Sequence, residues 1–320
     1  MVMQKILVIC GPTATGKTSL ALQLARKFQG ELISADSRQV YKGLDIGTGK
    51  ISFDDKFRKF KGKWLLNDVW IHGYDLVEPD KVFTVADFVD FFESTTQEIW
   101  RKGKLPILVG GTGFYIKAVL DGINTLGIPA DWELRETLKD FSTEQLQDKI
   151  RDLDPKKWKA MNESDKKNPR RLVRAIEIAL STQPLATKDQ KIRPSRTERW
   201  KLDALCIGLL APHDFLFQRT NRWVEERLEK GLVKEVEDLI KKGYKDAVSM
   251  QGIIYKPMVD FIEGKFDLMV LKEKLKNQIH DYVRRQLTWF KKDKRIFWFD
   301  ITEKKWKEKV EKKVRTWLNN

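Results

Sequence analysis

The stretch GPTATGKTSLA, residues 11–21, decides the fold because it carries the pattern G-x-x-x-x-G-K-[ST] of a phosphate-binding loop. The apolar run KILVIC (5–10) before it is typical of a buried strand. The amphipathic run from Lys17 to Phe28 is typical of a helix packed on a sheet. Strand, glycine-rich loop and helix are the context that this pattern needs. We therefore expect backbone N–H groups that converge on an anion at a helix N-terminus, which adds roughly half a positive charge.

The loop is expected to hold a diphosphate or a nucleotide. Lys17 supplies a full positive charge, and the Thr18 hydroxyl can bind Mg²⁺, the only metal that the sequence indicates. The three histidines and two cysteines show no zinc-site spacing. The pattern alone does not say which phosphate compound binds. The expected diphosphate-binding residues are Gly11, Pro12, Thr13, Ala14, Thr15, Gly16, Lys17 and Thr18.

Outward from the loop, strand patterns alternate with helix patterns. Buried strands are expected at 5–10, 31–35, 106–110 and 203–210, and helices at 17–28, about 84–102 and about 113–121. The alternation predicts an α/β fold with a phosphate loop in a doubly wound, mostly parallel sheet. Ligands of such sheets bind at the carboxyl ends of the strands. One site is therefore expected to combine the phosphate loop, ADSRQVY (35–41) and GGTGFY (110–115).

The pattern changes between residues 126 and 198, where the chain is charged, helical and poor in strands. We interpret this stretch, residues 126–198, as a helical insertion into a core made of residues 1–125 and 199–320. The second part of that core is mostly helical after 213, with one late apolar run, RIFWFD (295–300). Residues 54–75 predict a basic loop followed by a hairpin that turns at Asn67-Asp68.

Composition limits the class of protein. No run of eighteen apolar residues occurs, so a membrane span is not expected, and the early first strand leaves no room for a signal peptide. Cys10 and Cys206 lie in apolar runs and are expected to be buried free thiols, in keeping with a cytoplasmic protein. We also expect a monomer.

The net charge of +15 is concentrated in two blocks. The insertion block (149–201) and the C-terminal block (271–320) each hold 16 Lys and Arg against 7 Asp and Glu, and the rest of the chain has a net charge of −3. Two solvated helical faces would explain this distribution. A polyanion much larger than a nucleotide, gripped from two sides, would explain it as well.

Asp36 comes just after the second expected strand, where its carboxylate can face the phosphate loop. It is suited to act as a catalytic base or metal ligand. Asp-Ser is equally suited to an Asx turn or a helix cap, so the spacing alone leaves both roles open.

Several motifs occur in the order found in bacterial tRNA dimethylallyltransferases, also called tRNA isopentenyltransferases, which the chain resembles over about residues 4–300. The combination of DSRQVYKGLDIGT (36–48) with VGGTGFY (109–115) is highly specific to that family. The resemblance implies transfer of a dimethylallyl group from dimethylallyl diphosphate to N6 of the adenosine 3′ of a tRNA anticodon, with release of diphosphate. The other motifs are GPTATGKT, VADF, RRLVRAIEI, FQRTNRWVEERLEKGLVKEV and YVRRQLTWF.

The resemblance also assigns roles to residues. Asp36 matches the base that takes the proton of the adenine amine, and Thr112 lies in the channel where donor and adenine meet. An arginine after the insertion reaches the diphosphate; we favour Arg219 over Arg222, although surface salt bridges would explain either. The residues implied in tRNA contact are Asp36, Ser37, Arg38, Gln39, Thr112, Arg170, Arg171, Arg174, Met250, Gln251 and Gly252.

The chain departs from the family pattern at Asn168, where an acid is usual, at Ile254, where a glycine is usual, and in a longer, more aromatic loop at 52–70. Three alternatives stay open. A small-metabolite kinase would explain the loop but not the basic blocks, and an isopentenyltransferase of free adenine nucleotides would not need the insertion. A non-catalytic RNA-binding protein would not need Lys17, Thr18 and Asp36.

Overall fold

The computed structural model describes residues 4–50, 56–123, 125–182 and 202–320. The chain divides into two compact units. The larger unit comprises Met1–Asp121 and Trp200–Asn320, and the smaller unit comprises Gly122–Arg199. None of the helices in the described ranges is both long enough and apolar enough to span a bilayer.

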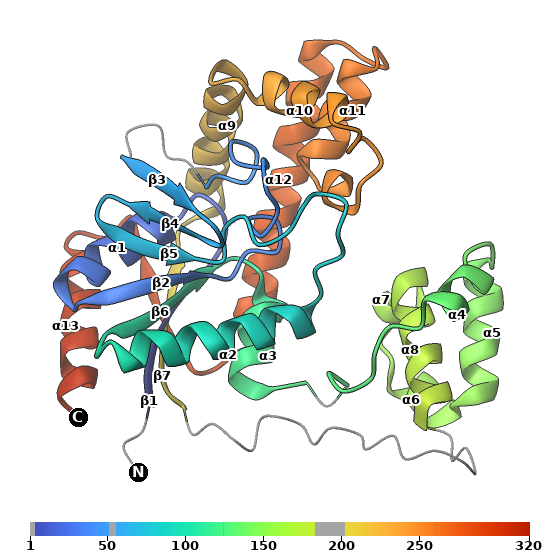
Figure 1. The fold of residues 1–320 in the computed structure, drawn as a ribbon, viewed down its shortest axis with the longest axis horizontal. Coiled ribbons are helices and arrows are strands. Elements are labelled where there is room, and N and C mark those ends of the chain that lie inside the picture. The colour runs from blue at the N-terminus through green and yellow to red at the C-terminus, as the bar shows by residue number, and fades with distance from the viewer. Residues whose placement is uncertain (1–3, 51–55, 124, 183–201) are drawn as a thin grey trace. The chain divides into compact units, whose positions relative to one another are not determined.

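The larger unit is built on a sheet of eight described strands (Figure 1). The pairs from β5 to β8 along the sheet are all parallel, whereas β3 pairs antiparallel with β4 and β4 with β5. This confirms the α/β, mostly parallel fold class, and the four strands expected from the sequence are all present. In spatial order the strands are β3 (Phe57–Phe60), β4 (Lys63–Leu66), β5 (Val69–His72), β2 (Gly30–Ser34), β6 (Leu105–Gly110), β1 (Gln4–Cys10), β7 (Leu202–Leu210) and β8 (Ile296–Asp300).

Helices cover both faces of this sheet. On one face α1 (Lys17–Lys27) and α13 (Trp306–Asn319) share a core with the strands, and on the other face α2 (Val85–Arg101) and α3 (Gly113–Asp121) do so. The start of α2 is fixed by a capping box in which Thr84 and Asp87 each accept the other's backbone N–H. The three helices predicted from periodicity are confirmed. Cys10 and Cys206 are buried free thiols, as expected.

A third layer of helices packs beside the sheet. It consists of α9 (His213–Glu229), α10 (Leu232–Lys241), the 3-10 helix η2 (Val248–Gln251), α11 (Tyr255–Ile262) and α12 (Leu268–Phe290). The core of this layer also takes in Val40, Tyr41 and Leu44 from the segment after β2. The chain that leaves the carboxyl end of β2 is therefore held by helices that come some 180 residues later in the sequence.

The predicted hairpin at Asn67-Asp68 is confirmed. Both residues have positive φ angles, 46° and 65°, as the tight turn between β4 and β5 requires. The prediction of a basic loop before this hairpin is wrong in part, because residues 57–60 form the strand β3. Phe57 stacks on Trp64 with ring centroids 5.2 Å apart, and such cross-strand aromatic pairs stabilise an added strand. The late run RIFWFD contains β8, which sequence analysis left unassigned.

The smaller unit is helical and has its own core. Its buried Glu177 accepts hydrogen bonds from Arg135 and Arg174 and from the Asp131 N–H, and these donors lower the pKa of Glu177 against the effect of burial. Residues 183–198 of the predicted insertion lie outside the described residues. The described helices are α4 (Trp132–Thr137), α5 (Thr143–Leu153), α6 (Pro155–Ala160), α7 (Glu163–Lys166) and α8 (Pro169–Thr182).

Candidate active site

The phosphate loop connects β1 to α1 and depends on two of its glycines. Gly11 has a φ of 134°, and a Cβ there would lie 2.4 Å from the Leu209 carbonyl oxygen. Gly16, with a φ of 81°, caps the N-terminus of α1. No larger residue fits at 11, and one at 16 would be strained. The loop therefore presents its backbone N–H groups at the start of a helix, where an anion is stabilised.

Lys17 folds back onto its own loop. Its ammonium group donates to the Pro12 carbonyl at 2.7 Å, and the Thr15 hydroxyl donates to the same oxygen at 2.9 Å. Burial lowers the pKa of Lys17 to about 8, against the opposing effect of Asp36. Because one neutral carbonyl is a weak partner for a half-buried cation, a diphosphate would be a stronger acceptor for Lys17.

The loops after β2 and β6 are in direct contact. The Thr112 N–H donates to the Ala35 carbonyl at 3.1 Å, and the Ser37 N–H donates to the Thr112 hydroxyl oxygen at 3.1 Å. A Cβ at Gly110 would lie 2.1 Å from the Ala35 carbonyl oxygen, so this close approach needs glycine. Two of the three stretches predicted to form one site therefore share a network of hydrogen bonds.

The Asp36 carboxylate is held by backbone donors. The Arg38 N–H donates to it at 2.8 Å, so the turn role that the sequence left open is present. Burial raises the pKa of Asp36, and the backbone N–H groups of Arg38 and Gln39 and the ammonium of Lys17 oppose this rise. A carboxylate whose pKa is raised by desolvation is a stronger proton acceptor than one in water, and so is suited to take a proton.

Helix α12 contacts these loops through the side chains of Tyr282, Gln286 and Trp289, which are four and three residues apart. Gln286 accepts the Thr13 N–H at 2.9 Å and donates to the Gly111 carbonyl at 3.0 Å. Four residues earlier, Tyr282 is hydrogen-bonded to Thr112, which opposes the burial that raises the pKa of Tyr282. These contacts connect the phosphate loop to the loop after β6.

The glycines of that second loop fit against the same helix. A Cβ at Gly111 would lie 2.2 Å from the Gln286 amide nitrogen, and one at Gly113 would lie 2.1 Å from the Trp289 ring. The motif GGTG therefore allows the loop after β6 to pack closely against the side chains of α12. The motif YVRRQLTWF, which contains all three α12 residues, contributes to the family resemblance, but its sequence alone assigned no role to these residues.

A cavity of about 310 Å³ opens beside these loops within the larger unit. Among the residues predicted for the site, it is lined by Thr13, Asp36, Ser37, Arg38, Gln251 and Gly252. Sequence analysis missed several other lining residues, including Trp223, Tyr255, Tyr282 and Arg285. Ile254, a departure from the family pattern, also lines the cavity, with a side chain in place of the usual glycine.

Other predicted residues do not line this cavity. Arg219 and Arg222 are exposed on α9, and Arg219 lies over the Phe215 ring at 5.7 Å. Met250 is fully buried in the helical layer. The Gln39 amide accepts from the Ser34 hydroxyl at 2.6 Å and donates to the Thr48 carbonyl at 3.1 Å, so it holds the loop together.

The three insertion arginines differ in their surroundings. Arg170 is exposed, and Arg171 is exposed and paired with Asp165. Arg174 donates to Glu177 and to the carbonyls of the segment that enters the smaller unit, at Thr125 and Ile128 among others. Asn168 accepts the Arg171 N–H at 3.3 Å at the start of α8, so this departure provides a helix cap.

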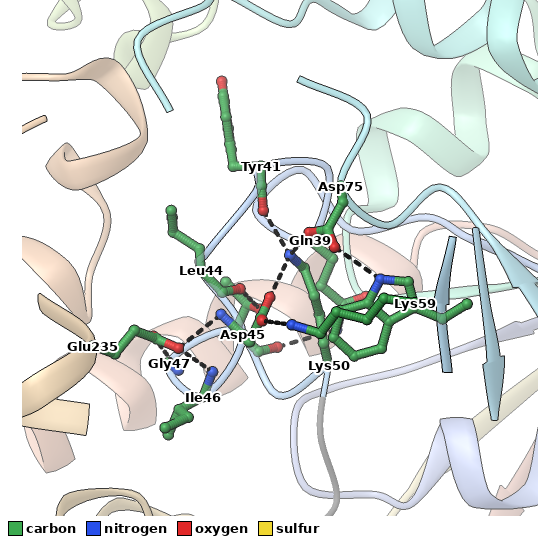
Figure 2. A network of polar contacts seen from close by, with 12 residues as sticks. Gln39, Tyr41, Leu44, Asp45, Ile46, Gly47, Lys50, Lys59, Asp75 and Glu235 are labelled. Atoms are coloured by element: carbon green, nitrogen blue, oxygen red, sulfur yellow. Dashed lines mark hydrogen bonds and ion pairs between the residues drawn. The ribbon is translucent and has the colours of Figure 1, made fainter. Parts of the chain in front are cut away.

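A buried ion network supports the cavity wall (Figure 2). The Lys50 side chain is 0% exposed, and its ammonium donates to Asp45 at 2.9 Å, to Asp75 at 2.6 Å and to the Tyr41 carbonyl at 2.6 Å. Here a buried cation has two carboxylate partners. Sequence analysis did not single out Lys50, because a lysine in a loop pattern is normally exposed.

Glu235 of α10 fixes the neighbouring backbone. Its carboxylate accepts the N–H groups of Asp45 at 2.9 Å, Ile46 at 2.6 Å and Gly47 at 3.1 Å (Figure 2). The Tyr255 hydroxyl also donates to it, at 2.8 Å. Any side chain at Gly47 would meet Tyr255, since a Cβ there would lie 2.6 Å from its hydroxyl. The segment that forms the cavity wall is therefore rigidly positioned.

The site offers little to a metal without a substrate. In the described part of the chain, no group of three or more His, Cys, Asp or Glu side chains could hold a metal ion. Mg²⁺ commonly binds through one or two protein groups together with substrate phosphates. Thr18, in the first turn of α1 next to Lys17, suits that mode of binding.

Comparisons with known proteins agree on one family. Residues 39–293 match the family model described as IPP transferase. The chain is 37% identical over 311 residues to a tRNA dimethylallyltransferase of Halalkalibacterium halodurans, covering 96% of this chain and 94% of that protein. It is also 37% identical over 322 residues to a tRNA dimethylallyltransferase of Acetivibrio thermocellus, covering 99% and 98%. The crystal structure of a full-length tRNA isopentenylpyrophosphate transferase from Bacillus halodurans superposes with a TM-score of 0.71 at 34% identity, covering 99% of this chain and 97% of that one.

Proposed function

The chain belongs to the IPP transferase family, and from that membership we propose that it is a tRNA dimethylallyltransferase. The reaction we propose moves the dimethylallyl group of dimethylallyl diphosphate to N6 of the adenosine 3′ of the anticodon and releases diphosphate. The observation that carries the proposal is the contact network that brings the phosphate loop, Asp36 and Thr112 to one edge of the sheet.

The chemistry needs a base beside the nucleophile. The lone pair of an adenine amine is delocalised into the ring, so the amine attacks carbon well only as it loses a proton. We assign that proton to Asp36, whose carboxylate is oriented by the Arg38 N–H. As the N–C bond forms, the C–O bond to the diphosphate breaks, and the bonding electrons leave with the oxygen.

The leaving group needs neutralised charge. We propose that Lys17 and the backbone of Gly11–Thr18 bind the diphosphate, in which case Lys17 exchanges the Pro12 carbonyl for a phosphate oxygen. Mg²⁺, held by Thr18 and the phosphates, would supply further positive charge when bound. Arg219 and Arg222 remain candidates for a phosphate contact, because both side chains are exposed on α9.

The RNA is proposed to enter through the cavity lined by Asp36, Ser37, Arg38, Gln251 and Gly252. For Gln39, whose amide is engaged, and for Met250, whose side chain is buried, we propose a supporting role or a backbone contact. A cytoplasmic monomer completes the proposal.

The proposal is tested by incubating the protein with dimethylallyl diphosphate, Mg²⁺ and unmodified tRNA and analysing the nucleosides for prenylated adenosine. Asp36→Asn should retain tRNA binding and lower the single-turnover rate by about 10² to 10⁴. A rate within a few-fold of the parent would exclude Asp36 as the base. Formation of ADP from ATP with a small metabolite, or prenylation of free AMP without tRNA, would support the kinase or the free-nucleotide alternative instead.

A further inference from the structure

The β3–β4 hairpin, residues 56–66, concentrates positive charge that a regional count hides. It carries five cations, and Asp68 is the only Asp or Glu between residues 56 and 72; Asp54 and Asp55 lie just before it, outside the described residues. The five cations are Lys56, Arg58, Lys59, Lys61 and Lys63. We call residues 56–66 the basic hairpin.

One end of the basic hairpin lies at the edge of the sheet where the site forms. Two antiparallel pairings make β3 run in the same direction as β5, and Lys63 is paired with His72 at the end of β5. The Gly73 N–H donates to the Gly62 carbonyl at 3.1 Å. The turn at Lys61-Gly62 therefore lies at the carboxyl edge of the parallel strands, and Lys56 lies at the opposite end beside Asn67.

The basic hairpin is also attached to the cavity wall. Lys59 donates to Asp45 at 2.5 Å, within the network that fixes Gly47 (Figure 2). Gly47 and Thr48 line the cavity that contains Asp36. Lys59 is thus engaged in structure, and its charge is balanced locally.

The cations at the turn are in a different situation. Lys61 is exposed, and Lys63 lies over the Trp70 ring at 4.8 Å. Among the described residues neither forms an ion pair with a carboxylate; Glu98 is paired with Lys102, which lowers the pKa of Glu98 with help from the charge of Lys63. Phe60, 45% exposed, lies beside them with its ring against Trp70. Unpaired cations next to an exposed aromatic ring suit single-stranded RNA, which offers phosphates and unstacked bases.

We propose, resting on the proposed function, that the turn of the basic hairpin binds the RNA strand that flanks the target adenosine. Lys61 and Lys63 contact its phosphates, and Phe60 stacks on a base. Neighbouring strands lie about 4.8 Å apart, so the turn is two to three spacings, or about 10–15 Å, from the end of β2. That separation suits nucleotides a few positions from the one that enters the cavity.

The test compares two ends of the same hairpin. The variant Lys61→Gln/Lys63→Gln removes charge at the turn, and Lys61→Gln alone removes it at an exposed position that does not contact the core. Lys56→Gln is the matched control, because it makes the same change at the opposite end. Affinity for unmodified tRNA is measured over a range of salt concentrations, together with donor affinity and the single-turnover rate at saturating tRNA.

The turn variants should bind tRNA several-fold more weakly, and the slope of log K against log salt should fall by about 0.7 to 0.9 for each phosphate that the variant no longer neutralises. Phe60→Ala should weaken binding without changing the slope, since a stacked base releases no counterions. Lys56→Gln should change neither quantity, and the rate at saturating tRNA should be unchanged in all variants. If both turn variants match Lys56→Gln, the hairpin does not bind RNA. If the parent protein prenylates no tRNA, the proposed function fails instead, and the two failures are therefore distinguishable.

Discussion

Lys50 behind the cavity wall is a fully buried lysine and Lys17 in the phosphate loop is a half-buried one, and their partners differ. Lys50 has two carboxylates and a carbonyl around its ammonium group, whereas Lys17 donates to the carbonyl of Pro12. A buried cation with its charge compensated is part of the architecture. A desolvated cation held by a neutral group, such as Lys17, can gain by binding an anion from solution. The comparison thus distinguishes a structural network from a binding site.

The comparison predicts that Lys50 matters most for stability. Lys50→Met takes the shared partner from the buried Asp45 and the half-buried Asp75. Because Asp45 keeps Lys59 and Asp75 keeps the Trp64 N–H, the free energy of unfolding should fall by about 3 kcal/mol, the lower end of the range for a broken buried pair. Urea denaturation measures this loss. Lys42→Met is the matched control, because its pair with Glu78 is exposed and should contribute no more than about 1 kcal/mol. Equal losses in the two variants would show that the buried network has no special weight.

Lys17 should behave in the opposite way. Lys17→Met removes a desolvated charge, and Asp36 loses a neighbouring cation but keeps its backbone donor at Arg38, so the fold should be about as stable as that of the parent. The single-turnover rate should nevertheless fall by about 10² to 10³, because stabilisation of the leaving diphosphate is removed. Filter binding should show nearly unchanged affinity for tRNA. A collapse of tRNA affinity with intact donor binding would show that the donor binds elsewhere.

A pH series sharpens the same contrast. The pKa of Lys17 is lowered to about 8 in the folded protein, below its usual value of 10.5. The unfolded chain therefore binds more protons between these values, and stability should rise with pH in that window, by about 2 kcal/mol at most between pH 7.5 and 9.5. The rise should be absent from Lys17→Met. Donor affinity should fall above pH 8, since the diphosphate needs the charged ammonium. An identical pH dependence of unfolding in parent and variant would contradict the assigned shift.

The smallest effects are expected among the insertion arginines, where compensated and uncompensated cations again differ. Arg170→Gln should weaken tRNA binding a few-fold and lower the salt slope by about 0.7 to 0.9, with no change in stability. Arg174→Gln should destabilise the smaller unit, because Arg174 compensates the buried Glu177. Limited proteolysis of the insertion and tRNA titrations distinguish the two.

The C-terminal block is tested in the same way. If that block also binds RNA, removing the charges of Lys291, Lys292 and Lys294 should lower the slope of log K against log salt independently of Arg170. If the Arg170 variant and the Lys291/Lys292/Lys294 variant both keep the salt slope of the parent, the insertion block and the C-terminal block are only solvated surfaces.

Much of the fold could be predicted because its signals are local. The phosphate loop needs glycine at two positions and lies between a strand and a helix, so a short window of sequence contains the whole pattern. The Asn67-Asp68 turn was equally readable. β3 was missed because it is a charged strand of four residues without a clear hydrophobic alternation. The stacking of Phe57 on Trp64, which stabilises it, is not evident from the sequence of the strand itself. The roles of Gln286 and Lys50 depend on partners distant in sequence or brought together by folding, and no periodicity reveals them. Arg170 and Arg174 look alike in sequence, and only the position of Glu177 separates them.

The hydrogen bonds of Gln286 also set a time at which the site can exist during synthesis. Thr13 and Gln286 are 273 residues apart, and β1 pairs with β7, which follows the smaller unit in the sequence. A nascent chain can complete β1, the phosphate loop and α1 early, but Gln286 of α12, which joins that loop to the loop after β6, is translated 273 residues after Thr13. The ribosome adds about 5–20 residues per second. The phosphate loop is therefore synthesised well before Gln286 and lacks its hydrogen bond to the Thr13 N–H during that time. The proposed donor site thus depends on residues from both ends of the larger unit's sequence, and a translation product that lacks α12 would carry the sequence motif without the finished loop.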